Sequence, residues 1–280
     1  MNSTDLGTLR PNKQLHIIMI METELGLKEI GIATFNVRSI NDEVKQEQLS
    51  KDIVKYRVQI CALQECKIKA GIDRRIGEER SRLITFSTKQ KAYGNGFIVS
   101  ADLACWIYKC WKVDDRACVI QINMDKDIDE SQHLLCKYKS LNQARKQNNP
   151  DESVPKKLLN IINVYGPTTT LVKQDVQMLD KLYTKLSNLL NDFKNKSGSI
   201  NIVLGDFNAK IGVSTGVEKC LGRFSRGRRN NSGQLLVNFC DINEMFIANS
   251  AFEHPARHRT TYSKTFTEKA SGEIKHYYTQ

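Results

Sequence analysis

The chain has 280 residues, 40% of them hydrophobic and 26% charged, so it can bury a core, which argues against disorder of the whole chain. Its 42 Lys and Arg against 31 Asp and Glu give a net charge of +11, which favours a polyanionic partner. Eight cysteines are scattered without a C-x-x-C pair or a flanking His, which argues against zinc and favours a reducing intracellular compartment, nuclear or cytoplasmic.

Residues 1–28 are interpreted as a poorly ordered leader that precedes a single domain at 29–280. The apolar run 15–21 within the leader is too short to span a bilayer, and no small-residue cleavage pattern follows it. We therefore expect neither a signal peptide nor a membrane anchor. An extra strand or translated leader sequence accounts for the run.

Two apolar segments at the start of the domain each end in polar side chains. Residues 30–36 end in Asn36, and residues 60–65 end in Gln64 and Glu65. Between them, apolar residues recur near helical spacing at Val44, Leu49, Ile53 and Val54. This region is therefore predicted to be a strand–helix–strand unit.

Further strands are expected at 97–99, after Gly94 and Gly96, and at 117–122, and all of them are compatible with one sheet of a two-sheet sandwich. Residues 125–157 are rich in Asp, Lys, Gln, Asn and Glu, and they cannot bury enough apolar area to order themselves. We interpret this segment as a polar surface insertion.

The second half of the domain begins with an apolar run that ends in Tyr165 before a Gly-Pro turn. Amphipathic spacing over 172–193 then predicts one long helix. The next apolar run, 200–206, stops abruptly at Asp206, with Asn208 two residues later. Such a β-branched run is typical of a central strand buried on both faces, so its end should present a carboxylate and an amide side by side.

A basic loop follows this strand, and its four arginines are Arg223, Arg226, Arg228 and Arg229. Guanidinium groups suit phosphate oxygens, although a solvated, mobile loop is the alternative interpretation. Residues 234–243 are predicted to form a helix with Leu235, Leu236 and Phe239 facing inward. His254 and His258 have the spacing of a metal pair, but the intervening Pro255 argues against a regular helix, so we expect them to face DNA or solvent.

The polar strand ends occur in an order that resembles a known superfamily. The motifs are Phe35-Asn36-Val37-Arg38, Leu63-Gln64-Glu65, Asn163-Val164-Tyr165-Gly166-Pro167 and Gly205-Asp206-Phe207-Asn208, with further similar segments at 227–240 and 248–252. Together they resemble the endonuclease/exonuclease/phosphatase superfamily. The greatest similarity is to the apurinic-type endonuclease domains of non-LTR retrotransposons and to their craniofacial-development-protein-like relatives, over roughly residues 30–262.

This resemblance implies an α/β fold, a four-layer α/β/β/α sandwich of two mixed β-sheets flanked by helices. It also implies a Mg²⁺-dependent phosphodiester hydrolase that acts on DNA, with Mn²⁺ as a substitute for Mg²⁺. No membrane and no obligate protein partner are expected. The resemblance implies a substrate contact for Asn249, and the clustering of positive charge predicts phosphate contacts for the four arginines of the basic loop.

The resemblance further implies a catalytic role for each matching residue. Glu65 is the leading Mg²⁺ ligand, with Asn36 beside it, because hard oxygen ligands suit this ion. Asp206 would orient or deprotonate the attacking water, and Asn208 would bind the same phosphate. Tyr165 would place its phenol near the leaving oxygen.

The chain departs from the superfamily pattern in one respect. The family closes with an Asp in an Ile-Asp-Tyr-like strand and then a Ser-Asp-His motif, whereas this sequence reaches Gln280 without a Ser-Asp-His. We therefore expect a sandwich without its last strands, and weak or absent activity. The alternatives are a catalytically dead nucleic-acid or protein binding module, and a superfamily phosphatase acting on a lipid or inositol phosphate. The basic loop favours nucleic acid over the phosphatase.

Overall fold

The computed structural model describes residues 16–21, 29–88, 93–125, 155–175, 177–194, 198–253, 262–267 and 274–279. The chain divides into two units. We call the larger one, within residues 15–166 and 188–207, the sandwich unit, and the smaller one, with residues 167–187 and 208–280, the second unit. Nearly all of the predicted polar insertion, most of the predicted leader, and His254 and His258 lie outside the described residues.

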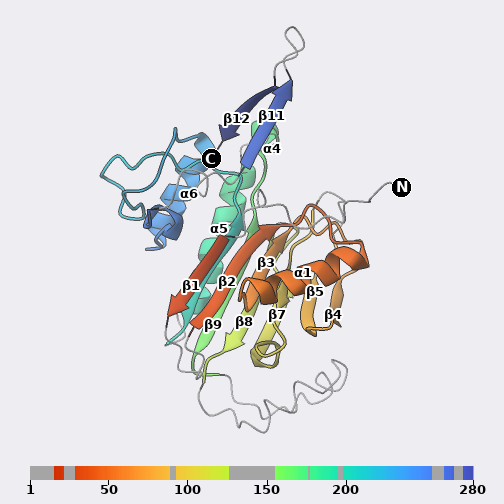
Figure 1. The fold of residues 1–280 in the computed structure, drawn as a ribbon. Helices are drawn as coiled ribbons and strands as arrows, with labels where there is room; N and C mark the ends of the chain where they lie inside the picture. The colour runs from red at the N-terminus through yellow and green to blue at the C-terminus, as the bar shows by residue number, and fades with distance from the viewer. Residues whose placement is uncertain are drawn as a thin grey trace. The chain divides into compact units, whose positions relative to one another are not determined.

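Six strands of the sandwich unit form a mixed sheet in the order β1-β2-β3-β6-β5-β4. They are β1 (His16–Met21), β2 (Glu29–Asn36), β3 (Ile60–Gln64), β4 (Ile72–Ile76), β5 (Ser81–Thr85) and β6 (Gly96–Val99). Figure 1 shows the first strands of this sheet, β1 and β2, side by side. Helix α1 (Glu43–Lys55) makes the crossover that the parallel strands β2 and β3 require. Asp42 caps this helix by accepting a hydrogen bond from the Val44 amide at 3.0 Å. The predicted strand–helix–strand unit is confirmed.

The remaining strands of this unit form a second mixed sheet in the order β10-β9-β8-β7. They are β7 (Ile107–Lys112), which follows the short 3₁₀ turn η1 (Ala104–Trp106), β8 (Ala117–Asn123), β9 (Leu158–Tyr165) and β10 (Ile200–Asp206). All eight residues of β9 are buried. Strand β10 runs parallel to β9 and is an edge strand among the described strands, so its prediction as a central strand was wrong. The β-branched run marks a strand without fixing its place in the sheet.

The two sheets pack face to face around a single apolar core. Ile60 and Phe97 of the first sheet meet Ile120 and Ile161 of the second in this core. On the outer face of the six-stranded sheet, α1 is held by a buried hydrogen bond of 2.9 Å between the Ser50 and Ser81 hydroxyls. The end of α5 (Gln177–Lys194) covers the other sheet, where Phe193 meets Trp111 edge to face. The predicted four-layer α/β/β/α sandwich is therefore confirmed.

Two details of the sandwich differ from expectation. The strand predicted at 117–122 belongs to the second sheet, whereas 30–36, 60–64 and 97–99 lie in the first. Hydrophobic runs identify such strands, but the assignment to a sheet depends on pairing between distant segments. Strands β4, β5 and β7 were not predicted, because polar side chains interrupt each of them.

The second unit holds the remaining elements. They are α4 (Thr169–Gln174), the first part of α5, α6 (Asn231–Ile242), the 3₁₀ turn η2 (Ala248–Ser250), β11 (Tyr262–Thr267) and β12 (Ile274–Thr279). The single long helix predicted over 172–193 is broken at Asp175, which has extended backbone angles and accepts a hydrogen bond from the Gln177 amide at 3.0 Å. Aspartate favours such a cap over a helix interior.

Helix α6 begins at Asn231, three residues before the predicted start. Asn230 caps it by accepting a hydrogen bond from the Gly233 amide at 2.8 Å. Leu236 and Phe239 are buried as expected, and Phe239 stacks on Tyr183 of α5, whereas Leu235 is only partly buried. Among the described helices, none combines the length and apolarity needed to cross a bilayer.

Candidate active site

The strand ends of the sandwich unit bring four predicted site residues together. In the parallel pair β2 and β3, Asn36 lies opposite Gln64, so Glu65 follows immediately beside it. In the parallel pair β9 and β10, Tyr165 lies opposite Asp206. Parallel strands end at the same edge of their sheet, and the stacking of the two sheets then places the two edges together.

Asn36 joins the two carboxylates of this cluster. Its Nδ2 donates to Glu65 Oε1 at 2.7 Å and to Asp206 Oδ2 at 3.0 Å, while its Oδ1 accepts from the Arg38 amide at 3.2 Å. The two carboxylate oxygens share one nitrogen, so they lie no farther apart than the sum of those two distances. Residues separated by 170 positions in the sequence thus form one acidic cluster, which we define as Asn36, Glu65, Tyr165 and Asp206.

Glu65 is held as a carboxylate by its neighbours. Its burial alone would raise the pKa, but hydrogen bonds from Asn36, Lys67 and Tyr165 outweigh burial and hold the pKa of Glu65 below its usual range. Lys67 Nζ lies 3.1 Å from Oε2, and the Tyr165 hydroxyl donates to Oε1 at 3.0 Å. Glu65 is therefore ionised at neutral pH. Its backbone φ of 54° is the left-handed conformation that a non-glycine residue adopts at a cost.

Tyr165 is nearly buried and acts as a hydrogen-bond donor in this cluster. Burial, followed by the charge of Glu65, raises the pKa of the Tyr165 phenol, so the hydroxyl keeps its proton at neutral pH. Arg116 lies with its guanidinium carbon 4.6 Å from the centre of the Tyr93 ring and 5.9 Å from that of Tyr165. Arg116 also donates to the Tyr165 carbonyl at 3.2 Å, which fixes the end of β9.

Three of these neighbours were not predicted from the sequence. Lys67 follows Glu65 by two residues, and this closeness in the sequence could have indicated an ion pair between them. Tyr93 and Arg116 come from separate segments and meet Tyr165 through the packing of the sandwich, so no local pattern marks them. All three surround the predicted acidic cluster.

The acidic cluster offers two carboxylates, which are oxygen ligands of the kind that divalent cations such as Mg²⁺ take. Among the described residues, no group of three or more His, Cys, Asp or Glu side chains converges. Two carboxylates are nevertheless what Mg²⁺ typically takes from a protein when it keeps several waters and a substrate phosphate. The amide of Asn36 presents its nitrogen to both carboxylates, and its oxygen accepts from Arg38. Glu65 and Asn36 were the predicted ligands; Glu65 could hold such an ion together with Asp206, whereas Asn36 turns its amide nitrogen to both carboxylates and would orient them.

The other predicted site residues belong to the second unit. Asn208 is partly buried and has a left-handed φ of 49°, and Asn249 is exposed on η2. Arg223, Arg226 and Arg228 are exposed, and the Arg223 guanidinium lies over the Phe224 ring.

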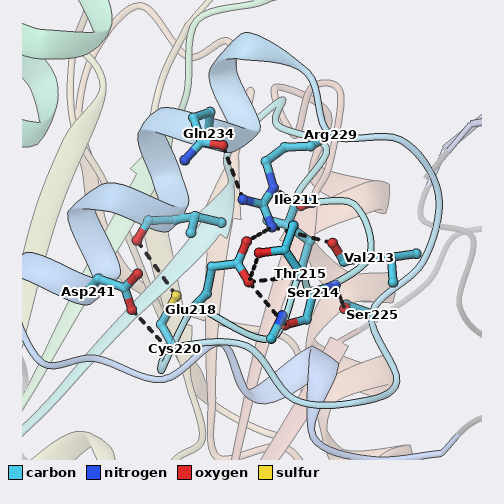
Figure 2. A network of polar contacts seen from close by, with 12 residues as sticks. Ile211, Val213, Ser214, Thr215, Glu218, Cys220, Ser225, Arg229, Gln234 and Asp241 are labelled. Carbon is cyan, nitrogen blue, oxygen red and sulfur yellow. Dashed lines mark hydrogen bonds and ion pairs between the residues drawn. The ribbon is translucent and has the colours of Figure 1, made fainter.

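Arg229 differs from the other arginines because it is tied into its own loop (Figure 2). Its guanidinium lies 2.6 Å from Glu218 and donates to the carbonyls of Ile211 and Val213 and to the Gln234 side chain of α6. A hydrogen bond from its own backbone amide, together with those from Arg229 and Thr215, outweighs burial and lowers the pKa of Glu218 to about 2. The Glu218–Arg229 pair therefore holds the basic loop against the start of α6.

This pairing predicts that two neighbouring arginines respond differently to truncation. Arg229→Ala is expected to lower the thermal midpoint of the full chain, because it removes the ion pair to Glu218 Oε1 and leaves two carbonyls without this donor. Arg228→Ala, at an exposed position, should stay within about 2 °C of wild type. Thermal unfolding followed by circular dichroism measures both.

The same pair gives the stability a defined pH dependence. Because the folded pKa of Glu218 is depressed, its contribution is present above the ordinary glutamate pKa and is lost as the pH falls toward about 2. The gap in thermal midpoint between wild type and Glu218→Gln should thus be widest at neutral pH and close in acid. A gap independent of pH would contradict the role assigned to this carboxylate.

Comparison with known proteins finds similarity over part of the chain. No family model matches. Craniofacial development protein 2 of Tragulus javanicus and that of Bos taurus are each 32% identical over 105 residues, which is 38% of this chain. The chain spans only 17% of the length of these curated relatives. The resemblance to craniofacial-development-protein-like relatives is thereby confirmed for this region.

Several solved structures also resemble the chain. The catalytic domain of Xenopus laevis APE2 has a TM-score of 0.45 at 16% identity and covers 74% of this chain and 67% of its own. An AP endonuclease from Archaeoglobus fulgidus has a TM-score of 0.41 at 17% identity, with 76% and 70% covered. The AP endonuclease LMAP from Leishmania major has a TM-score of 0.44 at 11% identity, with 75% and 65% covered.

Proposed function

We propose that the sandwich unit is a Mg²⁺-dependent phosphodiester hydrolase that cleaves DNA as an endonuclease. The observation that carries this proposal is the shared amide of Asn36, which holds the Glu65 and Asp206 carboxylates beside the donor hydroxyl of Tyr165. Two carboxylates and a neutral phenol supply a cation site, a base and a hydrogen-bond donor at one point. The net charge of +11 is consistent with a polyanionic substrate.

Each residue of the acidic cluster has a defined role in this proposal, and Asp206 has two. Glu65, ionised at neutral pH, and Asp206 hold the cation, which when bound neutralises charge on the phosphate. Asp206 also orients or deprotonates the attacking water. Asn36 keeps the two carboxylates at their spacing. Tyr165, whose hydroxyl donates to Glu65 in this structure, would turn its proton toward the leaving oxygen when substrate is bound.

The second unit supplies substrate contacts in the same proposal. Asn208 would hydrogen-bond a phosphate oxygen, and the exposed Asn249, Arg223, Arg226 and Arg228 would contact the DNA backbone. Arg229 was predicted to join them, but its guanidinium is already occupied within the loop. We therefore assign it to holding the loop that presents the other arginines.

A second candidate function is a nucleic-acid binding module without catalysis. The observation that favours it is the ion pair of Glu65 with Lys67, together with the hydrogen bond from Asn36, because both compete with a cation for that carboxylate. In this case the exposed arginines alone would provide affinity, through release of counterions from DNA.

A plasmid nicking assay decides between the two functions. The wild-type chain is incubated with supercoiled DNA and either Mg²⁺ or EDTA, and filter binding is measured over a range of salt concentrations. The hydrolase predicts nicking that requires the divalent ion. Salt-sensitive DNA binding without nicking in Mg²⁺ or Mn²⁺ would instead establish the binding module, and the absence of both nicking and binding would refute both candidates.

A further inference from the structure

A buried chain of amides lies between the two sheets, next to the acidic cluster. Asn163 of β9 and Gln64 of β3 are both almost fully inaccessible, and Gln64 Nε2 donates to Asn163 Oδ1 at 2.7 Å. Gln64 Nε2 also donates to the Thr34 hydroxyl of β2 at 2.9 Å. We call these three side chains the amide bridge.

Asn163 makes three hydrogen bonds across the sheet interface. While Oδ1 accepts from Gln64, Nδ2 donates at 2.9 Å to the carbonyl of Leu63 in β3 and at 2.9 Å to that of Gly96 in β6. Every one of these partners belongs to the six-stranded sheet, whereas Asn163 belongs to the four-stranded one. Because hydrogen bonds are directional, these three tie the end of β9 to β3 and β6 at this point, in addition to the apolar packing of the core.

Each residue of the amide bridge precedes a residue of the acidic cluster by one or two positions in the sequence. Thr34 precedes Asn36 by two residues, Gln64 precedes Glu65 by one, and Asn163 precedes Tyr165 by two. Each residue of the amide bridge is therefore joined to a residue of the acidic cluster by at most two residues of backbone, which span about 7 Å. The Tyr165–Glu65 hydrogen bond of 3.0 Å spans the same two sheets as the Asn163–Gln64 bond.

We propose that Asn163 is a positioning residue, which sets the separation between the Tyr165 hydroxyl and the Glu65 carboxylate through the amide bridge. The catalytic consequence rests on the proposed function; the geometric consequence does not. Removing the Asn163 amide frees the β9 end from β3 and β6, so Tyr165 and Glu65 lose their fixed spacing. A misplacement of about 1 Å at a reacting group lowers the rate by up to roughly 10²-fold without weakening ground-state binding equally.

Strand β9 itself supplies a matched control. Asn160 is as completely buried as Asn163, and it also uses both ends of its amide, accepting from Gln121 at 2.7 Å and donating to Asn201 at 2.8 Å. Both partners lie in β8 and β10, within the four-stranded sheet. Asn160→Ala thus removes an equally buried amide from the same strand without cutting a bond between the sheets.

The test compares Asn163→Ala with Asn160→Ala in the full chain. Both variants should lower the thermal midpoint, but Asn163→Ala should reduce kcat for DNA nicking by about 10–100-fold with little change in KM. Asn160→Ala should keep kcat near that of wild type. Crystal structures of wild type and both variants give the distance between Tyr165 Oη and the Glu65 carboxylate. This distance should be longer only in Asn163→Ala.

Asn163→Asp adds a readout that a purely structural role would not produce. The introduced carboxyl group still accepts from Gln64, and when protonated it can donate to one carbonyl in place of Nδ2; burial would raise its pKa. The kcat of this variant relative to wild type should therefore be highest at low pH and fall as the pH rises and the group ionises.

The outcomes separate this proposal from the proposed function. Equal kcat in Asn163→Ala and wild type, or an unchanged Tyr165–Glu65 distance in the variant structure, would overturn the positioning role even in an active enzyme. If the wild-type chain does not nick DNA, the proposed hydrolase fails, and the structural comparison alone then supports or overturns the positioning role.

Discussion

Glu65→Gln and Asp206→Asn are each expected to lower the rate of Mg²⁺-dependent plasmid nicking by about 10²–10⁴-fold. Each substitution keeps the shape of the side chain while removing one of the two negative charges that would hold the cation. Asn36 donates to both carboxylates, so a carboxamide in either place also leaves this donor without its charged acceptor. The initial rate of nicked-circle formation on an agarose gel gives the measurement.

The control for this prediction is an exposed carboxylate of the same unit. Glu47 lies on the exposed face of α1, so Glu47→Gln changes the net charge equally without touching the acidic cluster. It should nick at the wild-type rate. Equal rates for wild type, Glu65→Gln and Asp206→Asn would remove the acidic cluster from catalysis and attribute any nicking to another site or to a contaminating nuclease.

Gly205→Ala is expected to destabilise the chain by more than about 4 kcal/mol, a loss that few single substitutions reach. Gly205 has a φ of +146°, and a Cβ there would overlap the Val164 carbonyl oxygen of the neighbouring strand β9. That oxygen belongs to the backbone of a fully buried strand, so it has no room to move away. Urea unfolding followed by circular dichroism measures the loss.

Gly216→Ala is the matched glycine for this comparison. Gly216 also has a positive φ, of +87°, but no heavy atom lies within 4 Å of the position that its Cβ would take. This variant should lose only the about 1–3 kcal/mol that a left-handed non-glycine backbone costs. If the two variants unfolded at the same urea concentration, the clash with Val164 would not be the cause of the Gly205 effect.

The buried strands of the fold could be predicted from the sequence, because the hydrophobic pattern that marks each of them is local. Strands β2, β3, β8 and β9 are almost entirely buried, so each appears as a largely apolar run of the expected length. Strand β4 carries Asp73, Arg74 and Arg75 at the edge of its sheet, and its short mixed pattern does not stand out from loop sequence. The break at Asp175 was missed because the apolar spacing of α4 and α5 continues across it.

The acidic cluster could be predicted for a related reason. A buried strand that stops at a polar residue must place that residue at the rim of its sheet, and four such stops were visible at Asn36, Glu65, Tyr165 and Asp206. The resemblance to a nuclease superfamily then assigned them to one site. Arg229 was grouped with its neighbours on spacing alone, since the sequence cannot show that Glu218 neutralises it.

By itself, the sequence determined which side chains stand at the ends of buried strands, because burial is recorded in the apolar run that precedes each of them. Only the tertiary structure decided how those side chains bond to one another. The pairing of Asn36 with Asp206, of Tyr165 with Glu65, and of Asn163 with Gln64 joins residues about a hundred or more positions apart. Such contacts depend on how two sheets stack and on the register of their strands, and both are set by the packing of the whole core rather than by any local segment.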